Sequence, residues 1–134
     1  MLLWRYMVYE SPTGRPDVQK DIDRLTVEGV ERFAAAARWL SVTPTPGWHE
    51  PNAKKLKGYQ KLYEMKFIAD RVQQRPLGFF GPTPGVFSIV LWATHKQDVY
   101  KPSSALVTAN KRIKDVCEGR AKVAPLKLDG EDFP

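Results

Sequence analysis

The chain has 134 residues, of which 43% are hydrophobic and 27% are charged, and its formal net charge is +6 at pH 7. This length suits one folded domain, and the balance of apolar and charged residues excludes a globally disordered chain. No uncharged apolar stretch approaches the roughly 18 residues that cross a bilayer, and the opening MLLWRYMVYE lacks the cleavage site of a signal peptide. One cysteine and two histidines predict neither an internal disulfide nor a metal centre. We therefore expect a cytoplasmic protein with no membrane contact, no metal and no cofactor.

The positive charge is concentrated in the middle third of the sequence. Residues 54–101 hold nine basic and three acidic side chains, whereas the segments before and after them are nearly neutral. Such a concentration attracts polyanions and can hold phosphates. A solvated basic face without a partner would give the same composition, so the charge alone does not choose between these interpretations.

The first third of the chain predicts one strand and two helices. Residues 4–9, WRYMVY, are aromatic and β-rich, and a Ser-Pro-Thr-Gly turn ends them. After Pro16, apolar residues at positions 18, 22 and 25 have helical spacing, and Thr26 can cap a second helix that runs to about Leu40. The proline-rich segment 42–51 predicts a loop.

The rest of the chain predicts three strands and one helix. Residues 62–67 alternate, with Tyr63, Met65 and Phe67 on a core face and Leu62, Glu64 and Lys66 on a charged face. Residues 75–80 predict a short strand, residues 81–85 a turn, and the apolar run 86–93 a central strand. A helix is expected from Ser103 or Ser104 to about Gly119. The order β-α-α-β-β-β-α predicts an α+β fold with helices on a mostly antiparallel sheet, residues 1–119 forming one domain and residues 120–134 a flexible tail.

The candidate site is a set of cations on neighbouring strand ends. The sequence has no nucleotide-binding glycine loop, H-E-x-x-H, C-x-x-C or G-x-S-x-G motif, and few carboxylates in its basic middle. Cations and a phenol suit the cleavage of RNA by its own 2′-hydroxyl, because a lysine or histidine can transfer protons while an arginine grips the phosphate. The catalytic candidates are Lys66, Arg75, His95 and Lys96, and the candidate RNA and phosphate ligands are Lys54, Lys55, Lys57, Lys61, Arg71, Tyr100 and Lys101.

Each of these residues also has a purely structural interpretation. Lys66 can pair with Glu64 on the strand surface, and Arg75 can anchor Asp70. Tyr100 can pack at the entry of the last helix, and the lysines can serve solubility. His49 is left out of the site, because it is expected only to fix the proline-rich loop. The hypothesis rests on the set rather than on any single member.

Residues 54–113 resemble the RelE/HigB toxins of the RelE/ParE superfamily, particularly their phage-derived branch. The matching segments are KKLKGYQKLYEMKF (54–67), RPLGFFGP (75–82), VFSIVLWATHKQDVYKP (86–102) and SALVTANKRIKDV (104–116). The longer segment 70–76 and the Gln74-Arg75-Pro76 sequence depart from the family pattern. The resemblance implies a RelE-like small domain: an N-terminal strand, a helical hairpin, an antiparallel sheet of about four strands and a C-terminal helix.

The same resemblance implies a type II toxin that cuts mRNA without a metal, at the ribosome. It also implies a neutralising antitoxin, commonly a helix-turn-helix protein. In this interpretation Lys66 and Arg75 match the cationic strand positions, and His95 and Lys96 match the basic pair that closes the central strand. Two alternatives stay open: a protein-binding toxin of the gyrase-poisoning type, and a phage accessory protein without nuclease activity, because a fold does not establish a function.

Overall fold

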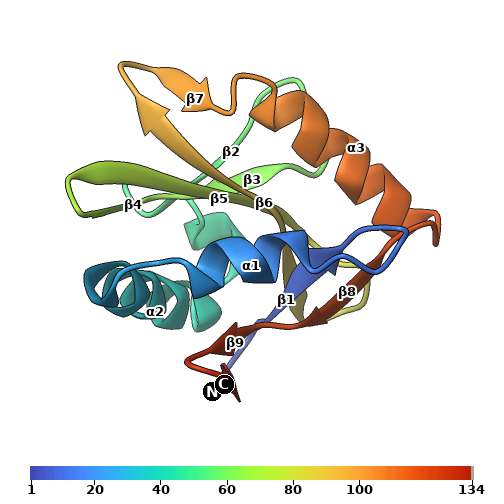
Figure 1. Ribbon diagram of the computed structural model, residues 1–134, viewed down its shortest axis with the longest axis horizontal. Coiled ribbons are helices and arrows are strands. Elements are labelled where there is room, and N and C mark those ends of the chain that lie inside the picture. Colours follow the sequence, from blue (N-terminus) through green and yellow to red (C-terminus); the bar gives the residue numbers. More distant parts are fainter. Residues whose placement is uncertain (134) are drawn as a thin grey trace.

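The structure is a computed structural model that describes residues 1–133. Strand β1 (Arg5–Glu10) precedes helices α1 (Asp17–Asp23) and α2 (Val27–Ser41) and a 3-10 turn, η1 (Thr45–Gly47). Six strands follow: β2 (Ala53–Lys55), β3 (Tyr63–Met65), β4 (Phe67–Ala69), β5 (Val72–Phe80), β6 (Val86–Lys96) and β7 (Val99–Lys101). Helix α3 (Ala105–Cys117) and strands β8 (Lys122–Pro125), β9 (Lys127–Leu128) and β10 (Glu131–Asp132) complete the described chain (Figure 1).

Eight of the strands form one mixed sheet in the order β2-β3-β5-β6-β1-β8, with β4 also paired to β5 and β7 to β6. Strand β1 runs parallel to β6, and the other pairs in this sheet are antiparallel. Strands β9 and β10 form a separate hairpin. The expectation of a RelE-like domain with about four antiparallel strands is therefore wrong: the fold is dominated by a larger, mixed sheet.

The additional strands are short and connected by turns without a sequence signal. Strands β4 and β5 are joined through Asp70 and Arg71, and β6 and β7 through Gln97 and Asp98, all four with φ between 50° and 63°. Turns of this kind usually carry glycine or asparagine, because positive φ crowds a Cβ atom. A three-residue strand such as β4 or β7 is also too short to show a period of two.

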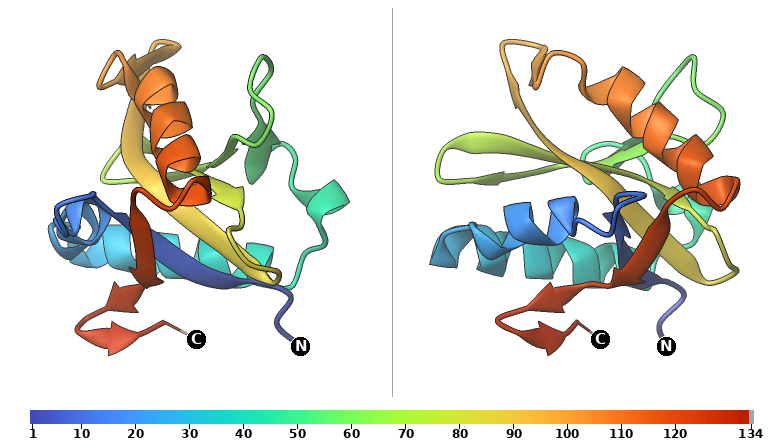
Figure 2. Two further views of the ribbon diagram at one scale, coloured as in Figure 1. Left: turned by 90° about the vertical axis from the view of Figure 1, so that its right-hand side faces the viewer. Right: turned by 45° about the vertical axis from the view of Figure 1, so that its right-hand side comes forward.

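Helices cover both faces of the sheet. Helices α1 and α2 lie on one face and α3 lies on the other (Figure 2). All three helices form where the sequence predicts them, and each turns an apolar stripe toward the sheet; Phe33, Leu40 and Ile113 are among the buried residues. Within residues 1–133, no helix has the length and apolar character needed to cross a membrane.

The segment after Gly119 belongs to the folded domain. Residues 122–125 form β8, which pairs antiparallel with β1, and Leu126 is fully buried. The expectation of a flexible tail over residues 120–134 is wrong for this part of it, because β8 pairs with one edge of β1 and extends the sheet. The sequence signal was weak, since this strand is short and ends at a proline.

Candidate functional site

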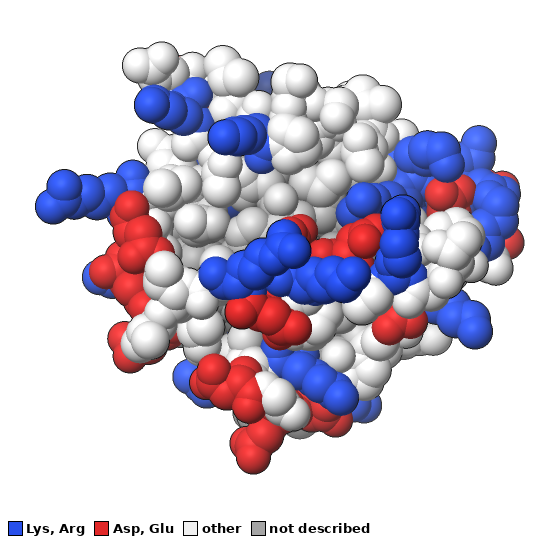
Figure 3. Space-filling view, viewed as in Figure 1, with Lys and Arg blue, Asp and Glu red and all other residues white. Residues whose placement is uncertain are grey.

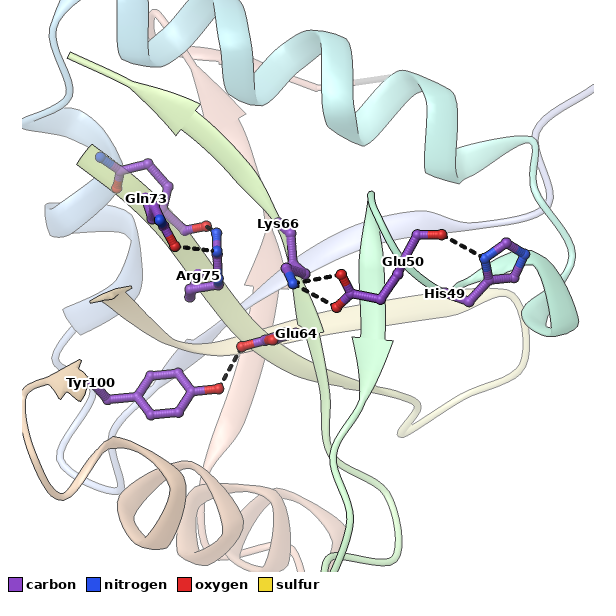
Figure 4. A network of polar contacts seen from close by, with 8 residues as sticks. His49, Glu50, Glu64, Lys66, Gln73, Arg75 and Tyr100 are labelled. Atoms are coloured by element: carbon purple, nitrogen blue, oxygen red, sulfur yellow. Dashed lines mark hydrogen bonds and ion pairs between the residues drawn. The ribbon is translucent and has the colours of Figure 1, made fainter. Parts of the chain in front are cut away.

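Polar side chains from four strands share the sheet face on which α3 packs. In the strand register, Gln73 of β5 lies opposite His95 of β6, and His95 lies opposite Tyr100 of β7. Glu64 of β3 lies opposite Leu77, two residues beyond Arg75 on β5. Because directly paired residues and residues two apart point to the same face, these side chains converge. We call Glu64, Gln73, Arg75, His95 and Tyr100 the polar cluster. Figure 4 labels four of them, Glu64, Gln73, Arg75 and Tyr100, and shows these four between α2 and α3.

Tyr100 contacts both the Glu64 carboxylate and the His95 imidazole, the two groups of the polar cluster that can transfer protons. Its hydroxyl donates a hydrogen bond to Oε1 of Glu64 at 2.5 Å, and its ring centroid lies 4.6 Å from that of His95. Burial, and then the hydrogen bond to the Glu64 carboxylate, raise the pKa of Tyr100 well above its ordinary value. The phenol therefore stays protonated at neutral pH and acts as a donor that fixes the Glu64 carboxylate.

Arg75 is a buried cation without a carboxylate partner. Its side chain is 6% exposed, with Nη1 donating to the carbonyl oxygen of Gln74 at 2.8 Å and Nη2 to Oε1 of Gln73 at 2.7 Å. Its Nε–H is the one buried side-chain polar group among residues 1–133 that has no hydrogen-bond partner. No carboxylate of the described chain forms an ion pair with it, so Asp70 is not its anchor. A buried guanidinium with a spare donor is suited to holding an anion.

Lys66 lies at the junction of β3 and β4 and is paired with an acid that the sequence did not indicate. Its Nζ contacts Oε1 and Oε2 of Glu50 at 2.5 and 2.8 Å, and this hydrogen bond lowers the pKa of the Glu50 carboxyl. Glu50 itself is exposed, and its carbonyl oxygen accepts a hydrogen bond from Nδ1 of His49 at 2.7 Å. The proposed pairing of Lys66 with Glu64 is wrong, since Glu64 binds Tyr100 instead (Figure 4).

The remaining candidate cations lie apart from the polar cluster. Lys96 follows His95 on β6, and Lys101 lies opposite Thr94, so alternation places both on the other face of the sheet. Lys54 and Lys55 belong to β2, with Nζ of Lys55 donating to the carbonyl oxygen of Tyr59 at 2.9 Å. The others occupy the β2–β3 connection and the β4–β5 turn: Lys57, Lys61 and Arg71. Figure 3 shows Lys and Arg interleaved with Asp and Glu on the face it displays, rather than gathered in one patch.

Two members of the polar cluster, Glu64 and Gln73, were not among the candidates from the sequence, and Glu64 is the one that carries a charge. The alternation placed Leu62, Glu64 and Lys66 on an outer face, yet Leu62 is fully buried and Glu64 is only 4% exposed. The reason is that α3 covers this face, so both sides of the strand are in the interior. The signal available was a lone carboxylate in the middle of an otherwise apolar strand, in a segment where acids are rare.

Comparison of the chain with protein-family models, with curated proteins and with solved structures gives no match. Within residues 1–133, no three His, Cys, Asp or Glu side chains are grouped as ligands of a metal ion would be. The polar cluster, with its buried guanidinium and its carboxylate and imidazole bridged by Tyr100, is therefore the feature of the described chain on which a functional assignment can rest.

Proposed function

We propose that the protein cleaves RNA by attack of a 2′-hydroxyl on the adjacent phosphodiester, with the polar cluster as the catalytic centre. The observation that carries the proposal is the convergence of a carboxylate, an imidazole and a buried guanidinium on one sheet face, from Glu64, His95 and Arg75. These are the three kinds of group that the reaction requires: a base, an acid and a fixed positive charge.

In the proposed reaction, Glu64 accepts the proton of the 2′-hydroxyl, and the 2′-oxygen forms a bond to phosphorus. Tyr100 occupies only one oxygen of the Glu64 carboxylate, so the other can take this proton. The bond from phosphorus to the 5′-oxygen breaks, and the protonated His95 ring gives that oxygen its proton. The products are a 2′,3′-cyclic phosphate and a 5′-hydroxyl, and both protons return by exchange with water.

Arg75 stabilises the charge that develops on the non-bridging phosphate oxygens. Its unpartnered Nε–H supplies a hydrogen bond that the folded protein does not use, and its two other bonds hold the guanidinium in place. Such prepositioned donors act strongly because they are shielded from water. Tyr100 acts through Glu64 and His95 as a positioning residue, since its hydroxyl bonds Glu64 and its ring packs against that of His95.

The resemblance of residues 54–113 to RelE/HigB toxins supports a narrower form of this proposal. In that form the substrate is translated mRNA in the cytoplasm, the protein is the toxin of a type II toxin–antitoxin pair, and a cognate antitoxin neutralises it. The support comes from the matching sequence segments alone, since the sheet is larger than that family's. Neither Lys96 nor Lys101 is needed for the proposed chemistry, because both lie on the opposite face of the sheet.

The test is cleavage of a labelled single-stranded RNA oligomer by the wild type and three variants. Glu64→Gln keeps an oxygen that Tyr100 can bond but removes the base, so we expect the rate to fall by about 10²- to 10⁴-fold. The cleavage rate of His95→Gln should fall by a similar factor. The control Glu31→Gln changes an exposed residue of α2, and its cleavage rate should equal that of the wild type. Cleavage that continues in Glu64→Gln and His95→Gln at the wild-type rate, or an inactive wild type, would overturn the proposal.

A further inference from the structure

A cavity lies between α2 and the junction of β3 and β4. Its volume is about 500 Å³, and its wall includes Arg32 and Trp39 of α2, Asn52, Phe67 of β4, and two residues near the cluster, Lys66 and Arg75. We call this cavity the edge pocket. Arg75 belongs both to this wall and to the polar cluster, so the edge pocket and the proposed catalytic centre share one side chain.

The charges of the edge pocket favour an anion. Three cationic side chains line it, Arg32, Lys66 and Arg75, and no acidic side chain does. Arg75, one of these lining residues, is more than nine-tenths buried, and its Nε–H has no hydrogen-bond partner in the protein. An unsatisfied buried donor is destabilising unless a ligand bonds it. Lys66 is held at the wall by Glu50, an exposed side chain that a competing phosphate could displace.

The aromatic residues of the edge pocket favour a flat ring beside that anion. Trp39 is 60% exposed on α2, whereas the other three tryptophans donate their indole N–H to protein oxygens. Phe67 of β4 also lines the pocket and is held by Phe33 and Trp92, at ring-centroid distances of 5.9 and 6.0 Å. A large aromatic side chain left exposed beside cations is the arrangement on which single-stranded nucleic acids stack their bases.

We propose that the edge pocket binds one nucleotide of single-stranded RNA next to the cleavage point, with its base on Trp39 and its phosphate at Arg32 and Lys66. The location of the pocket relative to the cleavage point rests on the proposed function, but nucleotide binding does not require catalysis. Base stacking on an aromatic side chain accounts for about a 5- to 150-fold effect on affinity. Trp39 is thus a binding residue and takes no part in bond breaking.

The experiment uses the exposure of Trp39 as its reporter. In a ¹⁵N-labelled sample the four tryptophans give four indole N–H signals, and the Trp39→Phe variant identifies the one that belongs to Trp39. The probe is a 2′-O-methyl RNA tetranucleotide, which cannot be cleaved because its nucleophile is blocked. We expect the Trp39 signal to shift in proportion to binding, with the hydrogen-bonded indoles of Trp4 and Trp48 unmoved, and Trp39→Ala to weaken binding by about 5- to 150-fold.

Matched controls separate the pocket from general electrostatic attraction. Arg32→Gln should weaken binding, while Arg15→Gln, which removes an equal charge from an exposed side chain outside the pocket, should not. Tetranucleotide binding that leaves the Trp39 signal in place, wild-type affinity in Trp39→Ala, or no binding at all would overturn the inference. Binding with a shifted Trp39 signal but no cleavage of unmodified RNA would overturn the proposed function alone. Cleavage without that shift would overturn the edge-pocket assignment alone.

Discussion

Replacing Arg75 with methionine separates a functional cation from a structural one. Arg75 is 6% exposed, has no ion-pair partner in the described chain and leaves Nε–H unbonded, so its charge is costly to bury. If Arg75 were present for stability, removing it would unfold the protein more readily. If it is present to hold a phosphate, the fold should tolerate an apolar side chain of similar length.

The expected change in the free energy of unfolding follows from the interactions that Arg75→Met removes. It loses two hydrogen bonds, to the carbonyl oxygen of Gln74 and to Oε1 of Gln73, each contributing roughly 1.5–3 kcal/mol when the donor is charged. It also removes an unsatisfied donor, which costs roughly 1–3 kcal/mol, and the desolvation of the charge, which costs several kcal/mol. The Gln73 side chain is exposed and regains water. These opposing effects are of similar size, so we expect the free energy of unfolding to fall by at most about 1 kcal/mol.

The assay is urea unfolding followed by tryptophan fluorescence, with RNA cleavage measured on the same preparations. Leu77→Ala is the reference for a structural residue on the same strand, because Leu77 is fully buried and such a truncation costs about 2–5 kcal/mol. We expect Arg75→Met to unfold at nearly the same urea concentration as the wild type, with the same dependence of the unfolding free energy on urea. We also expect this variant to lose RNA cleavage. A loss of stability comparable to that of Leu77→Ala would refute the argument that Arg75 is retained for binding.

Three further changes test the description of the fold. Asp115→Asn should lower the free energy of unfolding by about 1–3 kcal/mol at pH 7, because Asp115 accepts from Lys111 at 3.1 Å and Arg120 at 2.9 Å. These contacts lower the pKa of Asp115, so the difference from wild type should be complete above its ordinary value of 3.8 and shrink as the pH falls below it; a pH-independent difference in thermal unfolding would contradict this. Gly78→Ala should destabilise the protein by at least about 1–3 kcal/mol in urea, since a Cβ there would lie 2.2 Å from the backbone oxygen of Ser88. Leu126→Ala should cost about 2–5 kcal/mol in the same assay, because Leu126 is fully buried beyond β8, whereas a free tail would leave stability unchanged.

Sequence patterns identified the long elements of this protein and missed the short ones. The apolar stripe of α3 and the nearly continuous apolar run of β6 are long enough for their periods to be recognised, and both form as expected. Strands β4, β7 and β8 have three or four residues each, and their pairing depends on neighbours far away in the sequence. The size and mixed direction of the sheet could not follow from local patterns, since β1 and β6 pair across most of the chain.

The sequence indicated some residues of the candidate site and missed those whose positions depend on packing between distant segments. Charge and residue type pointed to Arg75, His95 and Tyr100, which the structure brings onto one face. Glu64 was overlooked because a carboxylate in an alternating strand is usually exposed, and only the packing of α3 buries it. The Glu50–Lys66 pair joins a loop residue to a strand junction, a contact that no spacing rule predicts. Lys96 was included because it follows His95, yet adjacent residues of a strand point to opposite faces.

The most direct test of RNA cleavage by the polar cluster is the chemical identity of the product ends. An RNA oligomer with one ribonucleotide in an otherwise 2′-deoxy strand limits attack to a single 2′-hydroxyl, and mass spectrometry then measures each fragment. The account predicts one cut, leaving a 2′,3′-cyclic phosphate and a 5′-hydroxyl, and no cut in the fully deoxy strand or with Glu64→Gln. Fragments ending in a 5′-phosphate, or cleavage of the fully deoxy strand, would contradict it.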